Sequence, residues 1–227
     1  MHDYYQQRYP QIVEQLEESL ALAASHFFTW LPGQPLESLR PSILKELESL
    51  VHDLPYVGGE KGRMTPFFEQ GAAALAVGRV LRALPAAEAV VQALMRETFL
   101  ARLRHLPVAE RIRLGQQFLS EESQAFLRAE AQRSRERENA GDFVYEFVEP
   151  AAGGSADGYA FGIDYRECGF CKLCKSTGDE DLLPHLCAVD KEFYAVRGIE
   201  LKRSTTLAGG DSRCDFRFRA TAPSPEF

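Results

Sequence analysis

The stretch DFVYEFVE, residues 142–149, decides the fold class of this chain of 227 residues, because a new sequence pattern begins there. The stretch is rich in aromatic and β-branched side chains and alternates in character, which is typical of a half-buried strand. The segment YAFGIDY (159–165) has the same character, and the composition of 150–158 predicts a turn between the two. Together they predict an antiparallel hairpin.

The part of the chain before this hairpin carries apolar side chains at helical spacing. The first series consists of Ile12, Leu16, Leu20, Ala23, Phe27 and Leu31. Four further helices are predicted over 40–51, 67–84, 87–106 and 109–141, with Pro and Gly residues between several of them. Residues 1–141 are therefore predicted to form a helical part.

After the hairpin, the pattern predicts two helices and then a second hairpin. A short helix begins near Cys168, and a longer one over 179–198 ends at a glycine. The second hairpin lies within 199–220. One face of its last strand carries Cys214, Phe216 and Phe218.

The order of these elements predicts an α+β fold, in which N-terminal helices pack on a C-terminal antiparallel sheet of about four strands with an αα insertion. The sequence has no internal repeat and no clear linker, so we expect a single domain over 1–227. It comprises a helical part (1–141) and a sheet part (142–220) that carries the cysteine motifs. The tail 221–227 is predicted to fray.

The charge balance argues against nucleic acid and membranes as partners. The chain has 33 acidic and 26 basic side chains, which give a formal net charge of −7. Its most basic stretch, 127–138, alternates Arg with Glu, and whether it supports a homo-oligomer stays open. The sequence has no apolar run of ~18 residues and no secretory signal, so we expect a cytoplasmic protein with free thiols and a small-molecule substrate as partner.

Three of the five cysteines, Cys168, Cys171 and Cys174, lie at intervals of three residues, and their role has several interpretations. With Cys187 they offer four thiolates, the ligand set of a zinc site or an iron–sulfur cluster. Alternatively, Cys168, Cys187 and Cys214 come from three segments that meet in one cavity, and no cofactor is needed. Cys171 and Cys174 are then small packed residues of a helix.

Cys187 and Asp190 are three residues apart on a predicted helix, so that a thiol and a carboxylate share one face. Cys168 lies near the start of its own helix, where the helix N-terminus favours a thiolate. A thiol that is activated by such surroundings is a candidate nucleophile. Both cysteines are therefore candidates for covalent catalysis.

The spacing of these residues resembles the pattern of a known family. Cys168 is followed by a glycine ten residues on and by Cys187 nineteen residues on, and an arginine-containing strand, the turn TLAGG and the strand CDFRF come later. This pattern is similar to the signature of the L-2-amino-thiazoline-4-carboxylic acid hydrolase family. The segment LPYVGGEKGRMTP (54–66) is similar to the family's N-terminal PYxGG segment. The matching residues are Cys168, Gly178, Cys187, Asp190, Arg203, Thr206, Leu207, Ala208, Gly210, Cys214, Asp215 and Phe216.

The resemblance implies a hydrolase that opens a cyclic amidine or isothiourea, such as 2-amino-thiazoline-4-carboxylate, to an N-carbamoyl amino thiol by cleaving a carbon–sulfur or carbon–nitrogen bond. It implies that Cys187 or Cys168 attacks the amidine carbon and that Asp190 binds the amidinium group. The implied substrate-binding residues are Arg203, which would hold the carboxylate, Thr206, Cys214 and Tyr56. The closing strand is also similar to ligand-binding domains of the vinyl-reductase type, so a non-catalytic small-molecule binding or sensing module is the alternative function.

Overall fold

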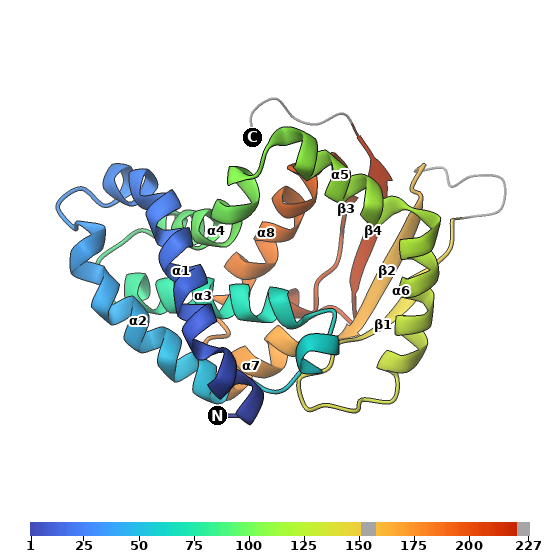
Figure 1. The fold of residues 1–227 in the computed structure, drawn as a ribbon, viewed down its shortest axis with the longest axis horizontal. Helices are drawn as coiled ribbons and strands as arrows, with labels where there is room; N and C mark the ends of the chain where they lie inside the picture. The colour runs from blue at the N-terminus through green and yellow to red at the C-terminus, as the bar shows by residue number, and fades with distance from the viewer. Residues whose placement is uncertain (151–157, 222–227) are drawn as a thin grey trace.

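The fold combines a helical part with a four-stranded sheet, and helices cover one face of that sheet (Figure 1). The computed structural model describes residues 1–150 and 158–221. The first part consists of α1 (Asp3–Trp30), α2 (Leu36–Asp53), the 3₁₀ turn η1 (Gly59–Lys61), α3 (Thr65–Arg82), α4 (Glu88–His105), α5 (Val108–Leu119) and α6 (Glu121–Ser134). The second part consists of β1 (Val144–Val148), β2 (Phe161–Glu167), α7 (Gly169–Thr177), α8 (Leu183–Ala195), β3 (Ile199–Lys202), the 3₁₀ turn η2 (Leu207–Gly209) and β4 (Cys214–Ala220). The fold class is α+β, as predicted.

Helix α3 packs closely against its neighbours because its side chains are small. Ala72, Ala74 and Ala76 are fully buried. A Cβ atom at Gly78 would lie 2.6 Å from Sδ of Met95 in α4, so the two helices approach too closely there for a larger residue. Helices α1, α2 and α4 all contact α3 and form the core of the helical part with it.

Ser120 divides the region that was predicted as one helix over 109–141. Its hydroxyl accepts a hydrogen bond from the Ser123 amide at 3.2 Å and forms the N-cap of α6. The prediction of one continuous helix was wrong, because capping of a new helix by a serine side chain competes with continuation of the old helix. After this break α6 packs on β1, and Leu127 and Ala131 are buried.

The sheet has the strand order β1-β2-β4-β3, and each pair of neighbouring strands is antiparallel. The predicted four-stranded sheet is confirmed, and so is the two-helix insertion between β2 and β3. In the central pair, Phe161 faces Phe218 and Tyr165 faces Cys214. Most of the turn predicted over 150–158, and of the tail predicted to fray over 221–227, lies outside the described residues.

One face of the sheet is apolar and the other is polar, as the alternation along the strands predicts. The buried side chains of β4 are Cys214, Phe216 and Phe218. The ring centroid of Phe218 lies 5.0 Å from that of Phe118 in α5 and 4.8 Å from that of Tyr194 in α8. Helices α5, α6 and α8 thus pack on the apolar face, while ion pairs such as Arg217 with Asp164 lie on the other.

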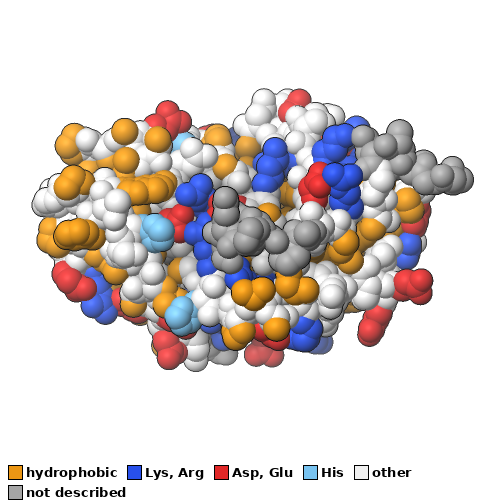
Figure 2. Space-filling view, turned by 90° about the horizontal axis from the view of Figure 1, so that it is seen from above, with side chains coloured by type: hydrophobic (Ala, Val, Ile, Leu, Met, Phe, Trp, Pro, Cys, Tyr) orange, Lys and Arg blue, Asp and Glu red, His pale blue; other side chains and the backbone are white. Residues whose placement is uncertain are grey.

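The surface carries charges of both signs. Figure 2 shows basic and acidic side chains interspersed with apolar ones on the face seen from above. The stretch 127–138 has ion pairs of its own, since Arg128 pairs with Glu149 and Arg133 pairs with Glu130. Within the described ranges, every helix is too short or too polar to cross a membrane.

Candidate active site

A small cavity, with a volume of about 80 Å³, is bordered by α7, α8 and the strands β2 and β4. Cys168, Cys187 and Asp190, the three residues predicted to be catalytic, line it together with Arg203 and Cys214. The remaining lining residues are Arg63, Met64, Phe67, Phe99, Phe143, Tyr165, Phe170, Leu186, Tyr194 and Phe216. A largely aromatic wall with a few polar groups is typical of a site for a small ligand.

The start of α7 carries two interacting thiols. Cys168 is the N-cap residue, and Cys171 lies in the first turn. The hydrogen bond with Cys171, together with burial, raises the pKa of Cys168, and the same hydrogen bond lowers the pKa of Cys171. When the pair ionises, the thiolate therefore lies at Cys171, near the positive end of the helix dipole, and Cys168 keeps its proton. Close packing fixes this helix start, since a Cβ atom at Gly169 would lie 2.5 Å from the carbonyl oxygen of Gly141.

Helix α8 presents Cys187 and Asp190 to the cavity from one face, as their spacing predicts. Pro184 lies in the first turn of this helix, a position that needs no backbone N–H donor. Burial, reinforced by the nearby Asp190 carboxylate, raises the pKa of the Cys187 thiol. The thiol is therefore protonated at neutral pH, and a cation that arrives beside it would lower its pKa.

The chain that follows β3 is held in place by the Asp215 carboxylate. Asp215 accepts hydrogen bonds from the backbone amides of Ser204 at 2.9 Å and of Thr205 at 2.6 Å, and from both hydroxyl groups. Burial raises the pKa of Asp215, but these hydrogen bonds outweigh it and keep the pKa far below its ordinary value. These hydrogen bonds fix the backbone next to Arg203, and therefore the point from which the Arg203 side chain extends.

Arg203 links the end of β3 to α8. Its Nη1 atom donates to Oδ2 of Asp190 at 2.6 Å, and its Nη2 atom donates to the carbonyl oxygen of Cys187 at 3.0 Å. The guanidinium carbon also lies 5.2 Å from the centroid of the Phe216 ring, and the side chain is only 8% exposed. Arg203 lies at the site, as predicted, but its guanidinium group already binds an internal carboxylate. This geometry makes it a positioning residue for Asp190.

Asp190 combines burial with contact to a cation. Burial raises the pKa of this carboxyl group to about 6, and Arg203 opposes the shift. The side chain keeps 35% of its accessible surface, and it lines the cavity. Asp190 is therefore ionised at neutral pH, and a carboxylate has more lone pairs than one arginine can use. It is suited to bind a small cation in the cavity.

The other predicted substrate-binding residues differ in their positions. Cys214 lines the cavity, and its sulfur accepts a hydrogen bond from the Leu207 amide at 3.2 Å. Thr206 caps η2, since its hydroxyl accepts from the Gly209 amide at 3.0 Å. Tyr56 lines a second cavity of about 360 Å³. The structure thus brings Cys214 to the other site residues but gives Thr206 and Tyr56 different surroundings.

The cysteines do not assemble the alternative metal site. Among residues 1–150 and 158–221, no group of three or more His, Cys, Asp or Glu side chains is arranged to hold a metal ion. Cys174 is fully buried in α7, and burial raises the pKa of its thiol to about 12. The side chain packs in the hydrophobic core. Cys174 is therefore a packing residue.

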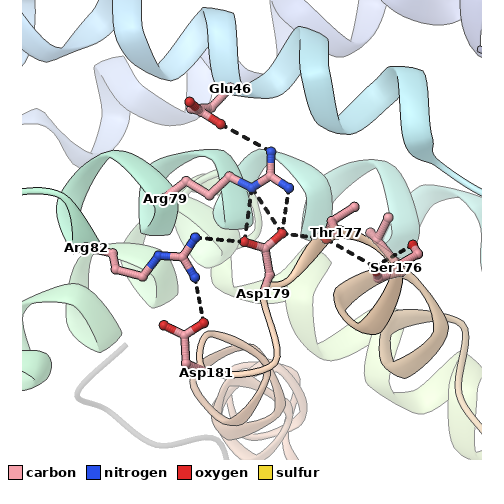
Figure 3. Close-up of polar contacts among 8 residues, drawn as sticks. Glu46, Arg79, Arg82, Ser176, Thr177, Asp179 and Asp181 are labelled. Carbon is pink, nitrogen blue, oxygen red and sulfur yellow. Dashed lines mark hydrogen bonds and ion pairs between the residues drawn. The ribbon is translucent and has the colours of Figure 1, made fainter.

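The loop between α7 and α8 is tied to α3 by a buried ion-pair cluster (Figure 3). The fully buried Asp179 carboxylate accepts hydrogen bonds from Arg79, the shortest at 2.6 Å, and from Arg82 at 3.1 Å. The Thr177 hydroxyl donates to it at 2.6 Å. Gly178, with φ of 73°, ends α7 and lets the chain turn into this loop. The cluster sets the relative position of the two helices that carry the cavity cysteines.

Arg63 also lines the cavity, although no motif in the sequence singles it out. It lies in the glycine-rich segment 54–66, ahead of α3, and lines the same cavity as Cys187. A single arginine in such a loop has no spacing relation to the residues of α8. The sequence therefore gives no signal that would bring the two together, and only the tertiary structure reveals the contact.

The comparison with known families agrees with the motif pattern. The family model described as L-2-amino-thiazoline-4-carboxylic acid hydrolase matches residues 86–218, which is more than half of the chain. The matched region contains Cys168, Cys187, Asp190 and Arg203, whereas Arg63 precedes it. No curated protein and no solved structure matches the chain. The chain belongs to the L-2-amino-thiazoline-4-carboxylic acid hydrolase family.

Proposed function

We propose that this protein hydrolyses a cyclic isothiourea of the 2-amino-thiazoline-4-carboxylate type to an N-carbamoyl amino thiol. One observation carries the proposal: Cys187 and the Asp190–Arg203 pair border the same small aromatic cavity. Such a cavity offers a nucleophile and an anion for a compact cationic ring, and the family name points to a hydrolase.

Recognition of the ring falls to Asp190. The amidine group of the substrate is planar when protonated and presents N–H donors to a carboxylate, which can accept two of them side by side. Arg203 holds Oδ2 of Asp190 at 2.6 Å and so fixes the orientation of the carboxylate. The substrate cation then lies close to Cys187, three residues away on the same helix face, and lowers the pKa of its thiol. Substrate binding thereby activates the nucleophile.

Ring opening follows in two steps. The Cys187 sulfur forms a bond to the amidine carbon, and the bond from that carbon to the ring sulfur breaks. The proton of Cys187 ends on the departing sulfur, relayed through Cys168, which lies close enough to Cys187 for their charges to interact and keeps its own proton at neutral pH. Water then adds to the same carbon and the bond to Cys187 breaks. The carbon becomes the carbonyl of a urea, one proton of the water returns to Cys187, and one is released.

The proposal predicts thiol release by the freshly reduced protein when it is mixed with 2-amino-thiazoline-4-carboxylate. The N-carbamoyl product, followed by mass spectrometry, should appear in step with a new thiol and over many turnovers. Treatment with a chelator should leave the rate unchanged. Binding without product would move the assignment to the small-molecule binding module, and loss of activity after chelation would move it to a metal-dependent reaction.

The rate should also depend on pH through Asp190. Its carboxylate must be ionised to bind the amidinium, and its pKa is about 6, so kcat/KM should fall about tenfold for each pH unit below that value. The Asp190→Asn variant should be slower and should lose this acidic limb. Circular dichroism at each pH would separate titration of the site from unfolding. An acidic limb that survives in Asp190→Asn would assign the titration to another group.

A further inference from the structure

The cavity contains a second guanidinium group in addition to Arg203. Arg63 lines the cavity from the loop before α3. Arg203 and Asp190 pair with each other. Among the residues that the structure describes, no carboxylate forms an ion pair with Arg63. A guanidinium that is partly buried without a counter-ion is unfavourable unless a ligand supplies one.

The loop that carries Arg63 is rigid at its base. Gly58 and Gly59 have φ values of 93° and 57°, which side chains other than glycine adopt only with strain. A Cβ atom at Gly62 would lie 2.0 Å from the carbonyl oxygen of Val57. The Thr65 hydroxyl donates to the carbonyl oxygen of Gly59 at 2.7 Å and closes the loop onto α3. The position of Arg63 is therefore built into the backbone on both sides of it.

Two tyrosines surround the Arg63 guanidinium and leave hydrogen-bonding capacity for a ligand. Its Nη2 atom donates to the Tyr165 hydroxyl at 3.2 Å, and its central carbon lies 5.1 Å from the centroid of the Tyr145 ring. Arginine carries five N–H donors, so others are available. The Tyr145 side chain is nearly fully buried and lines the second cavity, so its ring supports the Arg63 guanidinium from the side away from Cys187. A ligand carboxylate in the cavity would accept hydrogen bonds from the remaining N–H groups of Arg63.

We propose that Arg63 is the carboxylate subsite of this cavity. The inference rests on the proposed function and specifies its substrate class: a small zwitterion whose amidinium group binds Asp190 and whose carboxylate binds Arg63. Arginine binds carboxylates through two parallel hydrogen bonds, so this subsite would orient the ring as well as hold it. Because Arg63 lies outside the matched residues 86–218, the assignment comes from the structure of this chain rather than from the family pattern.

The test compares two substrates that differ in the carboxylate alone. For 2-amino-thiazoline-4-carboxylate, Arg63→Gln should lower kcat/KM by about 10- to 100-fold, the size expected for hydrogen bonds to a charged group, and chiefly through KM. For 2-amino-thiazoline, which lacks the carboxylate, the same variant should stay within about twofold of the parent. Arg63→Lys should keep part of the discrimination.

The matched control is Arg166→Gln, which removes an arginine of β2 that pairs with Glu146 outside the cavity. It should leave both substrates unaffected. Equal losses on both substrates in Arg63→Gln and Arg63→Lys would overturn the subsite and make Arg63 a structural residue.

A parent protein that turns over neither substrate would refute the proposed function without deciding the subsite, so binding is measured as well. Calorimetry should show that the parent binds 2-amino-thiazoline-4-carboxylate more tightly than 2-amino-thiazoline. Arg63→Gln should remove that preference. Equal binding of the two compounds by the parent, or no binding of either, would overturn the subsite.

Discussion

Replacement of Cys187 by alanine should lower the rate of thiol release from 2-amino-thiazoline-4-carboxylate by at least about 1,000-fold, because the loss of a covalent nucleophile costs a hydrolase several orders of magnitude. The side chain borders the cavity on the same helix face as Asp190. Cys187→Ser should be comparably inactive, since a hydroxyl in these apolar surroundings is far harder to ionise than a thiol. Both rates are measured by product formation under single-turnover and steady-state conditions.

The same experiment identifies the nucleophile among the five cysteines. Cys174→Ala is the matched control, because Cys174 is fully buried in α7 and does not line the cavity. It should keep the rate of the parent within about twofold. In Cys187→Ser, trapping with substrate should leave no covalent adduct, whereas the parent should carry a transient adduct at Cys187. If Cys187→Ala stays active and a Cys171 variant does not, the thiolate at the start of α7 is the nucleophile instead.

Replacement of Asp179 by asparagine should lower the free energy of unfolding by about 3 to 5 kcal/mol, the usual cost of removing one partner from a buried ion pair. Arg79 is only 12% exposed, and without Asp179 it would keep only the partly exposed Glu46 as a counter-ion. For a domain of this size, the loss corresponds to a fall in Tm of about 10 °C. Chemical denaturation followed by circular dichroism would measure it.

Asp181→Asn is the control for this effect, because Asp181 binds the same Arg82 but is 58% exposed. An exposed pair contributes at most about 1 kcal/mol. Equal losses in the two variants would show that burial of Asp179 does not determine its contribution.

The stabilising effect of Asp179 should also depend on pH. Burial raises the pKa of Asp179, but hydrogen bonds from Arg79 and Thr177 outweigh it and lower the pKa below its ordinary value. The stabilisation is therefore complete above about pH 4 and is lost as the pH falls through the lower folded-state value. The difference in stability between the parent and Asp179→Asn should shrink in that range.

Several features of the fold could be predicted because they depend on local sequence. Helical spacing identified the N-terminal helices, and alternation in β4 correctly placed Cys214, Phe216 and Phe218 on its buried face. The break at Ser120 was missed, because a serine between two helical stretches can either continue a helix or cap a new one. Which of the two occurs depends on the sheet that α6 packs against.

The candidate site, like the fold, could be predicted only in part. Cys187 and Asp190 could be paired from their spacing on one helix, since residues three apart share a face whatever surrounds the helix. The partner of Arg203 could not be predicted, because strand alternation limits which face the side chain takes but not which charge lies there. Asp215 matches the family pattern, but its role could not be predicted, because it lies in β4 and its carboxylate holds the chain next to Arg203 across the loop between two strands.

Apart from the break at Ser120, the sequence by itself determined the order of helices and strands, their buried faces, the thiol and carboxylate of α8, and the family, because each follows from local periodicity or motif spacing. Only the tertiary structure decided that Asp190 binds Arg203 and that Arg63 enters the same cavity. These contacts join residues far apart in the chain. They depend on how loops close and how elements pack, and the repeat of a helix or strand carries no information about either.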